Sequence, residues 1–587
     1  MDDEGVAVTQ TSDPTSTLQR TASGVVNGVR DLLDPGALAA RVDPVAFGGA
    51  LGDVAKGLLA HPLPVARRTA GLAAGSGRAA LAALARSVGG HGAGPAPLPD
   101  KDRRYADPAW EGNAYYYLLR QQHALFAEYL EAVAKGVELK PVSRRKIDFL
   151  VQQAVEATSP VNWPWSNPTM VKKAFETGGQ SLFRGSRNLL RDVVGGGGMP
   201  RQTTPGEFEV GKDLAATPGV VVHRNRLMEL IQYKPQTEQV HEIPLLLSPP
   251  WINKYYIMDL APQKSLVEWA VQHGHTVFVI SYRNPDESMR DVVMADYMQE
   301  GPLAALDVVQ DITGSDKVNV AALCLGGTLA AATAAWLAAR GDQRINTITL
   351  MNTLLDFSEP GRLGVFTDET TVNRLENTMR RTGYLPASSM KTTFDLLRAT
   401  DLVWNYVIND WLLGEEPAAF DMLAWNADST RMPAAMQTEY LRNLYLDNQL
   451  VEGKMELAGE RLDLGAVTQD AYVVSAEADH IAPWRSVYKG LRHLGGTVRF
   501  VLSNSGHIAG VVNPPSPKSK HWFGEGADLP ESADDWRDDA GEHRASWWED
   551  WSPWIGERAG EMTAPPRLGS DAHPVLQAAP GSYVLGT

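Results

Sequence analysis

The stretch "VNVAALCLGGTLAAA", from Val318 to Ala332, contains the only cysteine of the chain, Cys324. The residues before Cys324 form a short apolar run, which is typical of a buried strand. The residues after it begin with Gly326 and Gly327 and continue as an alanine-rich run, which favours a helix. The stretch therefore predicts a strand, a tight turn that carries the thiol, and a helix.

Strand-like and helix-like segments alternate on both sides of this turn. The expected strands are "IPLLLSPP", "HTVFVISYR", "KVNVAAL", "INTITLMN", "AYVVSAEADH" and "TVRFVLSNSGH", and an earlier hairpin is expected in "GVVVHRN" and "RLMELIQYKP". The expected helices between strands are "SLVEWAVQHG", "YMQEGPLAALDVVQDITG" and "GGTLAAATAAWLAAR". Strands that alternate with helices build a parallel sheet with helices on both faces. We therefore predict an α/β fold with a doubly wound, mostly parallel sheet.

Composition divides the rest of the chain. Residues 1–100 are rich in alanine and glycine, and we expect a flexible segment there. Within it, residues 53–87 have two interpretations: a weak amphipathic helix that lies on an apolar surface, or a flexible tail with nascent helix. We predict a helical domain over 101–215 and a catalytic domain over 216–587. The pattern breaks over 356–426, where we expect an inserted cap.

Charge and cysteine content exclude several classes of protein. The net charge of -16 argues against a nucleic-acid-binding surface, which needs a basic patch. A single cysteine excludes an intramolecular disulfide and a multi-cysteine metal site, so we expect no metal. The acidic N-terminus lacks the features of a signal peptide, and no run reaches the roughly 18 apolar residues of a membrane span. We expect a cytoplasmic protein that binds no nucleic acid and does not span a membrane.

The turn at Cys324 matches the nucleophile elbow of the α/β-hydrolase fold, which presents one side chain above the sheet. The usual pattern is Gly-x-nucleophile-x-Gly, and here Ala322 occupies the first position. Alanine is the smallest alternative to glycine, so the turn can form with slight crowding. The competing interpretation of Cys324 is a buried apolar filler.

A nucleophilic thiol needs a base, and in this fold the chain order is nucleophile, acid, histidine. Asp479 follows one late strand and His507 follows the next, so both fit that order. Asp479 could also cap a helix, and Glu477 is the rival acid. His507 could be an ordinary loop histidine, and we expect His480 to lie behind the catalytic residues.

An acyl-transfer site also needs two backbone N–H donors for the oxyanion. The first should be the N–H of Leu325, directly after the thiol. The second should come from the early loop "SPPWINKYY", at Trp251 or Ile252, and Ile252 is our choice. The alternative is that this loop is merely a rigid turn.

With these residues in place, the chain from about Asp102 to Val584 resembles the polyhydroxyalkanoate synthases. These enzymes polymerise (R)-3-hydroxyacyl-CoA thioesters into bacterial storage polyester. The resemblance rests on "PPWINKYYIMDL", "GHTVFVISYRNPD", "CLGG", "DLVWNYVIND", "EADHIAPW" and "SGHIAGVVNPP". The length and the helical N-terminal region are similar to the class I enzymes, which favour short-chain monomers such as 3-hydroxybutyryl-CoA.

The resemblance implies a role for each site residue. Cys324 is the nucleophile that carries the acyl group, and His507 is its base. Asp479 activates the incoming hydroxyl or orients His507. The resemblance also implies a mobile cap, a homodimeric active form and association with cytoplasmic polyester granules. No cofactor is implied, because coenzyme A is part of the substrate and a product.

Two rival functions remain open from the sequence. The first is a hydrolase of the same fold, either an intracellular polyester depolymerase or an acyl-CoA thioesterase. The second is a granule-coat or scaffold protein with a relict fold, for which replacing Cys324 would change nothing. The complete Cys, Asp and His set argues against the second.

Overall fold

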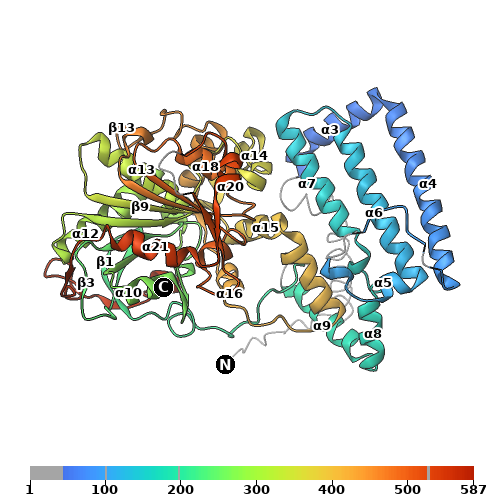
Figure 1. The fold of residues 1–587 in the computed structure, drawn as a ribbon, viewed down its shortest axis with the longest axis horizontal. Helices are drawn as coiled ribbons and strands as arrows, with labels where there is room; N and C mark the ends of the chain where they lie inside the picture. The colour runs from blue at the N-terminus through green and yellow to red at the C-terminus, as the bar shows by residue number, and fades with distance from the viewer. Residues whose placement is uncertain (1–43, 91, 99–101, 196–197, 525–528, 587) are drawn as a thin grey trace, which may run out of the picture. The chain divides into compact units, whose positions relative to one another are not determined.

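The chain forms two compact units in a computed structural model, which describes residues 44–90, 92–98, 102–195, 198–524 and 529–586 (Figure 1). The first unit comprises Met1–Thr204 and Thr393–Ala418. The second comprises Pro205–Thr392 and Ala419–Thr587.

The second unit is built on an 11-stranded sheet with the order β17-β16-β15-β14-β9-β8-β4-β7-β2-β1-β19. The six central strands, from β15 to β7, run parallel, and the strands at both edges pair antiparallel. Their bounds are β1 (Gly219–Arg224), β2 (Met228–Tyr233), β4 (Leu245–Ser248), β7 (Val277–Tyr282), β8 (Val318–Leu323), β9 (Ile345–Met351), β14 (Asp470–Ala476), β15 (Val498–Ser503), β16 (His521–Phe523), β17 (Gly541–His543) and β19 (Gln577–Ala578).

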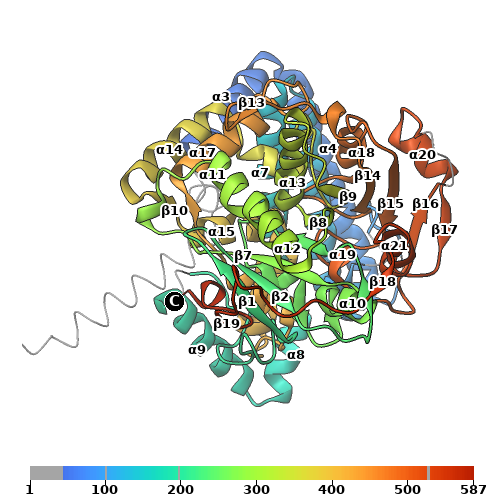
Figure 2. The ribbon, with the colours of Figure 1, turned by 90° about the vertical axis from the view of Figure 1, so that its left-hand side faces the viewer.

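Helices cover both faces of this sheet (Figure 2). On β8, Val320 and Ala322 belong to one core cluster, and Ala321 and Leu323 belong to the other, because successive strand residues face opposite sides. The predicted doubly wound sheet is thus confirmed. The first cluster includes residues of α12 (Ala304–Thr313), α13 (Leu325–Ala339) and α18 (Trp484–Leu491), and the second those of α10 (Leu266–Gln272) and α21 (Trp547–Gly556).

Among the described residues, four small two-stranded ladders supplement this sheet. They are β3 (Val240–His241) with β18 (Met562–Thr563), β5 (Asp259–Ala261) with β6 (Lys264–Ser265), β10 (Tyr384–Leu385) with β11 (Met432–Pro433), and β12 (Glu456–Leu457) with β13 (Glu460–Arg461). The candidate catalytic residues follow strands of the main sheet and not strands of these ladders.

The first unit is helical. Its main helices are α3 (Pro44–Ala60), α4 (Pro62–Ser87), α6 (Ala114–Lys135), α7 (Pro141–Ala157), α8 (Pro168–Glu176) and α9 (Gln180–Gly195). Ala79 of α4 packs with Leu125 of α6, and Ala50 of α3 packs with Ile147 of α7. Residues 44–87 therefore form packed helices, which differs from the flexible segment predicted for residues 1–100. The part of that prediction that covers residues 1–43 lies outside the described residues.

The insertion between β9 and β14 runs from 352 to 469, which is longer than the predicted cap over 356–426. It contains α14 (Glu369–Thr382), α15 (Ala387–Leu397), α16 (Asp421–Ala427) and α17 (Ala434–Tyr440). The insertion is divided between the two units: Thr393–Ala418 belongs to the first unit, and the rest of the insertion belongs to the second. The boundary between the units falls after Thr204, whereas the sequence predicted a domain boundary after residue 215. Within the described residues, no helix has both the length and the apolar character needed to cross a membrane.

Candidate active site

Cys324 occupies a strained turn between β8 and α13. Its backbone has φ 53° and ψ -122°, a conformation that costs a non-glycine residue about 1–3 kcal/mol. Hydrogen bonds hold the turn: the N–H of Cys324 donates to the carbonyl oxygen of Met351 at 2.8 Å. The carbonyl oxygen of Cys324 accepts the N–H of Gly327 at 2.9 Å and that of Thr328 at 3.2 Å. The strand, turn and helix predicted from the sequence are therefore present.

The two glycines after Cys324 permit a close approach of other segments. A Cβ atom at Gly326 would collide with the carbonyl oxygen of Ser248 and lie 2.6 Å from that of Pro249. A Cβ atom at Gly327 would collide with the side chain of Thr353. The start of α13 thus lies directly against the loop that follows β4.

Ala322 stands where the elbow pattern usually has glycine. It pairs with Ser248 on β4 and with Leu350 on β9, and it is completely buried. Its methyl group is part of the core cluster on that face of the sheet. The turn is therefore compatible with alanine at this position.

Asp479 and His507 form a buried pair at the ends of β14 and β15. His507 Nδ1 lies 2.6 Å from Asp479 Oδ2. The other carboxylate oxygen, Oδ1, accepts the N–H of Ile481 at 2.8 Å and that of Ala482 at 2.9 Å. Asp479 thus binds His507 and also closes a tight turn. It does not cap the next helix, because α18 begins at Trp484.

The electrostatics of His507 connect this pair to the thiol. Burial alone lowers the pKa of His507, but the carboxylate of Asp479, the charge of ionised Cys324 and hydrogen bonds to both raise that pKa to about 10. The imidazole is only 7% exposed, so these charges interact through little solvent. The three residues selected from the sequence therefore come together, and the interactions with Asp479 and Cys324 favour the protonated form of His507.

The rival acid and the neighbouring histidine lie elsewhere. Glu477 is exposed, and its carboxylate pairs with Arg537 at 3.6 Å, whereas Asp479 binds His507. His480 is half-buried, and its carbonyl oxygen accepts the N–H of Arg362 at 3.1 Å. That bond holds the turn next to Asp479, and a supporting role for His480 stays a prediction.

The two backbone groups expected to form the oxyanion hole belong to the start of α13 and to the loop after β4, and these two segments meet at Gly326. Leu325 is the first residue of α13, so its N–H has no partner within the helix. Trp251 is buried, and Ile252 is half-buried; both belong to the core cluster against which Cys324 packs. The oxyanion role of Leu325 and Ile252 stays a prediction.

A pair of tyrosines beside the thiol was not identified from the sequence. Tyr440 ends α17, and its hydroxyl donates to that of Tyr445 at 3.0 Å. Burial raises the pKa of both phenols, and the charge of Cys324 adds to the effect. Tyr440 belongs to the core cluster against which both Cys324 and Tyr445 pack. The two tyrosines are five residues apart across the π-helical turn Leu441–Leu446, in which hydrogen bonds link residues five apart. In the sequence, only the spacing of these two tyrosines inside an irregular insertion could have indicated the pair.

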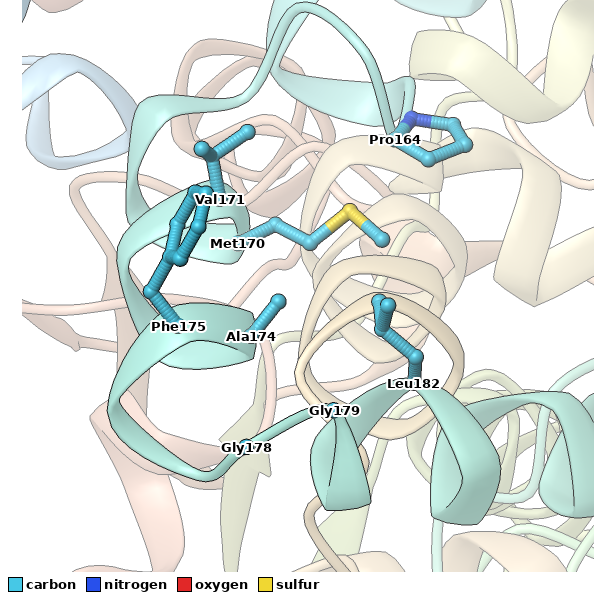
Figure 3. Close-up of a pocket in the computed structure, with 8 residues that line it drawn as sticks. All are labelled: Pro164, Met170, Val171, Ala174, Phe175, Gly178, Gly179 and Leu182. Carbon is cyan, nitrogen blue, oxygen red and sulfur yellow. The ribbon is translucent and has the colours of Figure 1, made fainter.

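The first unit contains an apolar pocket with a volume of about 430 Å³ (Figure 3). It is lined by residues of the segment before α8, of α8 itself, of the turn after it and of the start of α9: Pro164, Met170, Val171, Ala174, Phe175, Gly178, Gly179 and Leu182. None of these side chains ionises or acts as a nucleophile, so the pocket offers apolar contact alone. Among the described residues, no three His, Cys, Asp or Glu side chains are grouped as metal ligands.

Comparison with known proteins gives a consistent result. Residues 101–270 match the family described as "Poly-beta-hydroxybutyrate polymerase (PhaC) N-terminus", and residues 239–514 match the alpha/beta hydrolase fold. A poly(3-hydroxyalkanoate) polymerase of Methylorubrum extorquens is 45% identical over 489 residues, which cover 83% of this chain and 81% of that relative. The poly(3-hydroxyalkanoate) polymerase subunit PhaC of Cupriavidus necator is 42% identical over 494 residues, or 83% of each chain.

Solved structures resemble the chain only distantly. The monoacylglycerol lipase of Paleococcus ferrophilus is 13% identical, with a TM-score of 0.31, and the match covers 56% of this chain and 97% of the lipase. The assignment of the α/β-hydrolase fold therefore rests on the family match and on the sheet itself.

Proposed function

Because the chain belongs to the poly(3-hydroxyalkanoate) polymerase family, we propose that it polymerises (R)-3-hydroxyacyl-CoA into polyester and releases coenzyme A. The monomer is a short one such as 3-hydroxybutyryl-CoA. The observation that carries the catalytic part of the proposal is the Asp479–His507 pair, 2.6 Å apart, beside the single cysteine. A hydrolase is not favoured, because the relatives that match most of the chain are named as polymerases.

The first step transfers the acyl group to Cys324. His507 holds the thiol proton, and the thiolate attacks the thioester carbonyl of the substrate. The oxyanion that forms accepts hydrogen bonds from the N–H groups of Leu325 and Ile252. The bond from carbon to the coenzyme A sulfur breaks, and the departing thiolate takes the proton from His507. Asp479 accepts the Nδ1–H of His507 and stabilises the imidazolium until this proton leaves with coenzyme A.

The second step lengthens the chain. The 3-hydroxyl of another hydroxyacyl-CoA gives its proton to His507 and attacks the acyl group on Cys324. An ester bond forms, the bond to the sulfur breaks, and the thiolate is restored. The product still ends in a coenzyme A thioester, so it can acylate Cys324 again.

A thiol suits this cycle better than a hydroxyl. Exchange between two thioesters is close to thermoneutral, so the acyl group on Cys324 stays activated for the next ester bond. A serine would form an oxygen ester and lose that activation. Water would compete with the incoming hydroxyl, so the site must exclude it. Trp251 and Tyr440 are buried in the core cluster against which Cys324 packs, and the half-buried Tyr445 packs against the same cluster, which supports that requirement.

Mass spectrometry of the intact protein tests the proposal. After incubation with 3-hydroxybutyryl-CoA, we expect free coenzyme A, insoluble polyester and acyl adducts on the protein. Because the chain has one cysteine, a thioester adduct that reacts with hydroxylamine can only be on Cys324. The Cys324→Ala variant should form neither adduct nor polymer. Release of soluble 3-hydroxybutyrate without polymer would contradict the proposal and indicate a hydrolase.

Association is a further part of the proposal. An insoluble product that remains bound to the site would hold the enzyme at the surface of the polyester granule, and family membership leads us to propose a homodimer and no cofactor. Light scattering before and during polymerisation, together with sedimentation of the granules, tests both kinds of association. A monomer throughout the reaction would contradict the dimer.

A further inference from the structure

Two consecutive residues at the end of β9 contact the backbone of every segment that carries a proposed catalytic residue. The carbonyl oxygen of Met351 accepts the N–H of Cys324 at 2.8 Å. The N–H of Asn352 donates to the carbonyl oxygen of Val474 at 2.8 Å, on the strand that leads to Asp479. The side-chain nitrogen Nδ2 of Asn352 donates to the carbonyl oxygen of His507. These contacts follow from the sheet order, in which β9 lies between β8 and β14.

The amide of Asn352 is committed to this contact. Asn352 is completely buried and has φ 45°, in the left-handed region where asparagine is among the few residues found without large strain. A carbonyl oxygen only accepts hydrogen bonds, so the amide must present its nitrogen to His507. The amide oxygen Oδ1 is then left buried with no hydrogen-bond partner among the described residues. Unsatisfied buried groups of this kind are uncommon and call for an explanation.

We propose that Asn352 is a positioning residue that fixes the loop of His507, so that the imidazole stays between Asp479 and Cys324. The Asp479 carboxylate binds one nitrogen of the imidazole ring, but this bond does not fix the backbone of His507, so the ring can still move when that backbone moves. The bond from Asn352 anchors the backbone of the same residue, which removes that freedom. The proposal rests on the roles given above to Cys324 and His507.

The single cysteine allows a test without substrate. Alkylation by iodoacetamide reports the reactivity of Cys324 alone. In Asn352→Gly the left-handed backbone stays favourable, and only the amide is lost. In Asn352→Asp the shape is kept, but a carboxylate oxygen faces the carbonyl of His507. We expect both variants to be alkylated at least about tenfold more slowly at pH 7, since a displacement of about 1 Å in a reacting group has large effects on rate. Their pH profiles should move towards that of His507→Ala.

A matched control lies on the same strand. Asn346 is at the opposite end of β9, and its side-chain nitrogen donates to the carbonyl oxygen of Arg558 at 2.6 Å. Asn346→Asp makes the same chemical change and should leave the alkylation rate and its pH profile unchanged. A structural role for Asn352 alone would lower the unfolding temperature without moving the pH profile of the folded protein.

Each outcome is decisive. If His507→Ala leaves the pH profile of alkylation unchanged, the proposed function of His507 fails, and the inference about Asn352 fails with it. If His507→Ala shifts the profile but Asn352→Gly matches the native protein, only the inference is overturned. Failure of Asn352→Gly to fold would also overturn it, because the position would then be structural. If Asn352→Asp does not fold, Asn352→Gly decides.

Discussion

Single residues decide whether the elbow closes. Gly326 lies against the carbonyl oxygens of Ser248 and Pro249 at the start of the loop that carries Trp251 and Ile252. Those oxygens belong to the backbone, so they cannot rotate away from an added methyl group. The loop and the start of α13 must separate instead. Stability and the proposed oxyanion hole therefore depend on the same glycine.

We expect Gly326→Ala to lower the free energy of unfolding by about 1–3 kcal/mol, which is the usual cost of overpacking. Acylation of Cys324 should fall more steeply than stability, because the loop with Ile252 moves. Urea unfolding and the rate of coenzyme A release measure the two effects. Gly71→Ala, on α4 with no atom near its new Cβ, is the control: it should leave coenzyme A release unchanged and raise the free energy of unfolding by about 0.5–1 kcal/mol, because alanine favours a helix interior over glycine. Equal behaviour of the two variants would contradict the prediction.

At the scale of elements, α9 holds the returning segment Thr393–Ala418 through two buried carboxylates, Asp192 and Asp410. Arg191 pairs with Asp192 at 2.9 Å and with Asp410 at 3.2 Å. The side chain of Asn188 donates a hydrogen bond to Asp410. Asp192 accepts a hydrogen bond from Trp411 and pairs with Arg201. Glu416 pairs with Arg191 and lies 4.0 Å from Arg187. Burial and then the charge of Asp192 raise the pKa of Asp410 to about 7.

This carboxyl pair makes the attachment of the segment depend on pH. The pKa of Asp410 in the folded protein is raised above its value in the unfolded chain. The protonated carboxyl group therefore stabilises the attachment of the segment fully below about pH 4, and this stabilisation is lost as the pH rises through about 7. We expect Asp410→Asn, which stays neutral and can donate to Asp192, to flatten that dependence. Hydrogen exchange of residues 400–413 between pH 5 and 8, corrected for the intrinsic rate, measures it.

A control for this change lies in the same segment. Asp401 is exposed, and its carboxylate pairs with Arg398, so Asp401→Asn should keep the pH dependence of the native protein. If Asp410→Asn also exchanges with the native pH dependence, the buried carboxyl pair is not its source.

At the scale of the whole molecule, residues far apart in sequence complete the sheet of the second unit. The last strand, β19, pairs with β1. The carboxylate of Glu229, on β2, is completely buried and accepts the N–H groups of Ser582 and Tyr583 at 3.0 Å each. Arg224 is its ion-pair partner at 2.6 Å. The final residues therefore satisfy a charge that lies inside the edge of the sheet.

We expect deletion of residues 577–587 to destabilise the second unit by about 3–5 kcal/mol, the usual cost of removing partners from a buried charge. Part of this cost should be recovered when Glu229→Gln is added to the deletion, because the buried group that has lost the N–H donors of Ser582 and Tyr583, while keeping Arg224 nearby, is then neutral. Thermal unfolding of the native, deleted and doubly altered chains measures the effect. The prediction is wrong if Glu229→Gln brings no recovery.

The catalytic half of the fold could be predicted because its signals are local. Each central strand is a short apolar run, and the turn at Cys324 needs small residues directly after it. Over 53–87 the sequence left a helix and a flexible tail as alternatives, because alanine and glycine carry too little apolar surface to mark a buried face. The burial of α3 and α4 depends on α6 and α7, whose approach is a long-range event. The return of 393–418 to the first unit had no local signal either.

By itself, the sequence determined the order of strands and helices, the strained turn at Cys324, and the candidates Asp479 and His507, because periodicity, steric demands and chain order are properties of neighbouring residues. Only the tertiary structure decided that Asp479 rather than Glu477 meets His507, that Tyr440, Tyr445 and Cys324 share one core cluster, and that Asn352 holds the loop of His507. The reason is physical: hydrogen bonds and burial depend on distances between strands, and a chain has those distances only after its sheet has formed.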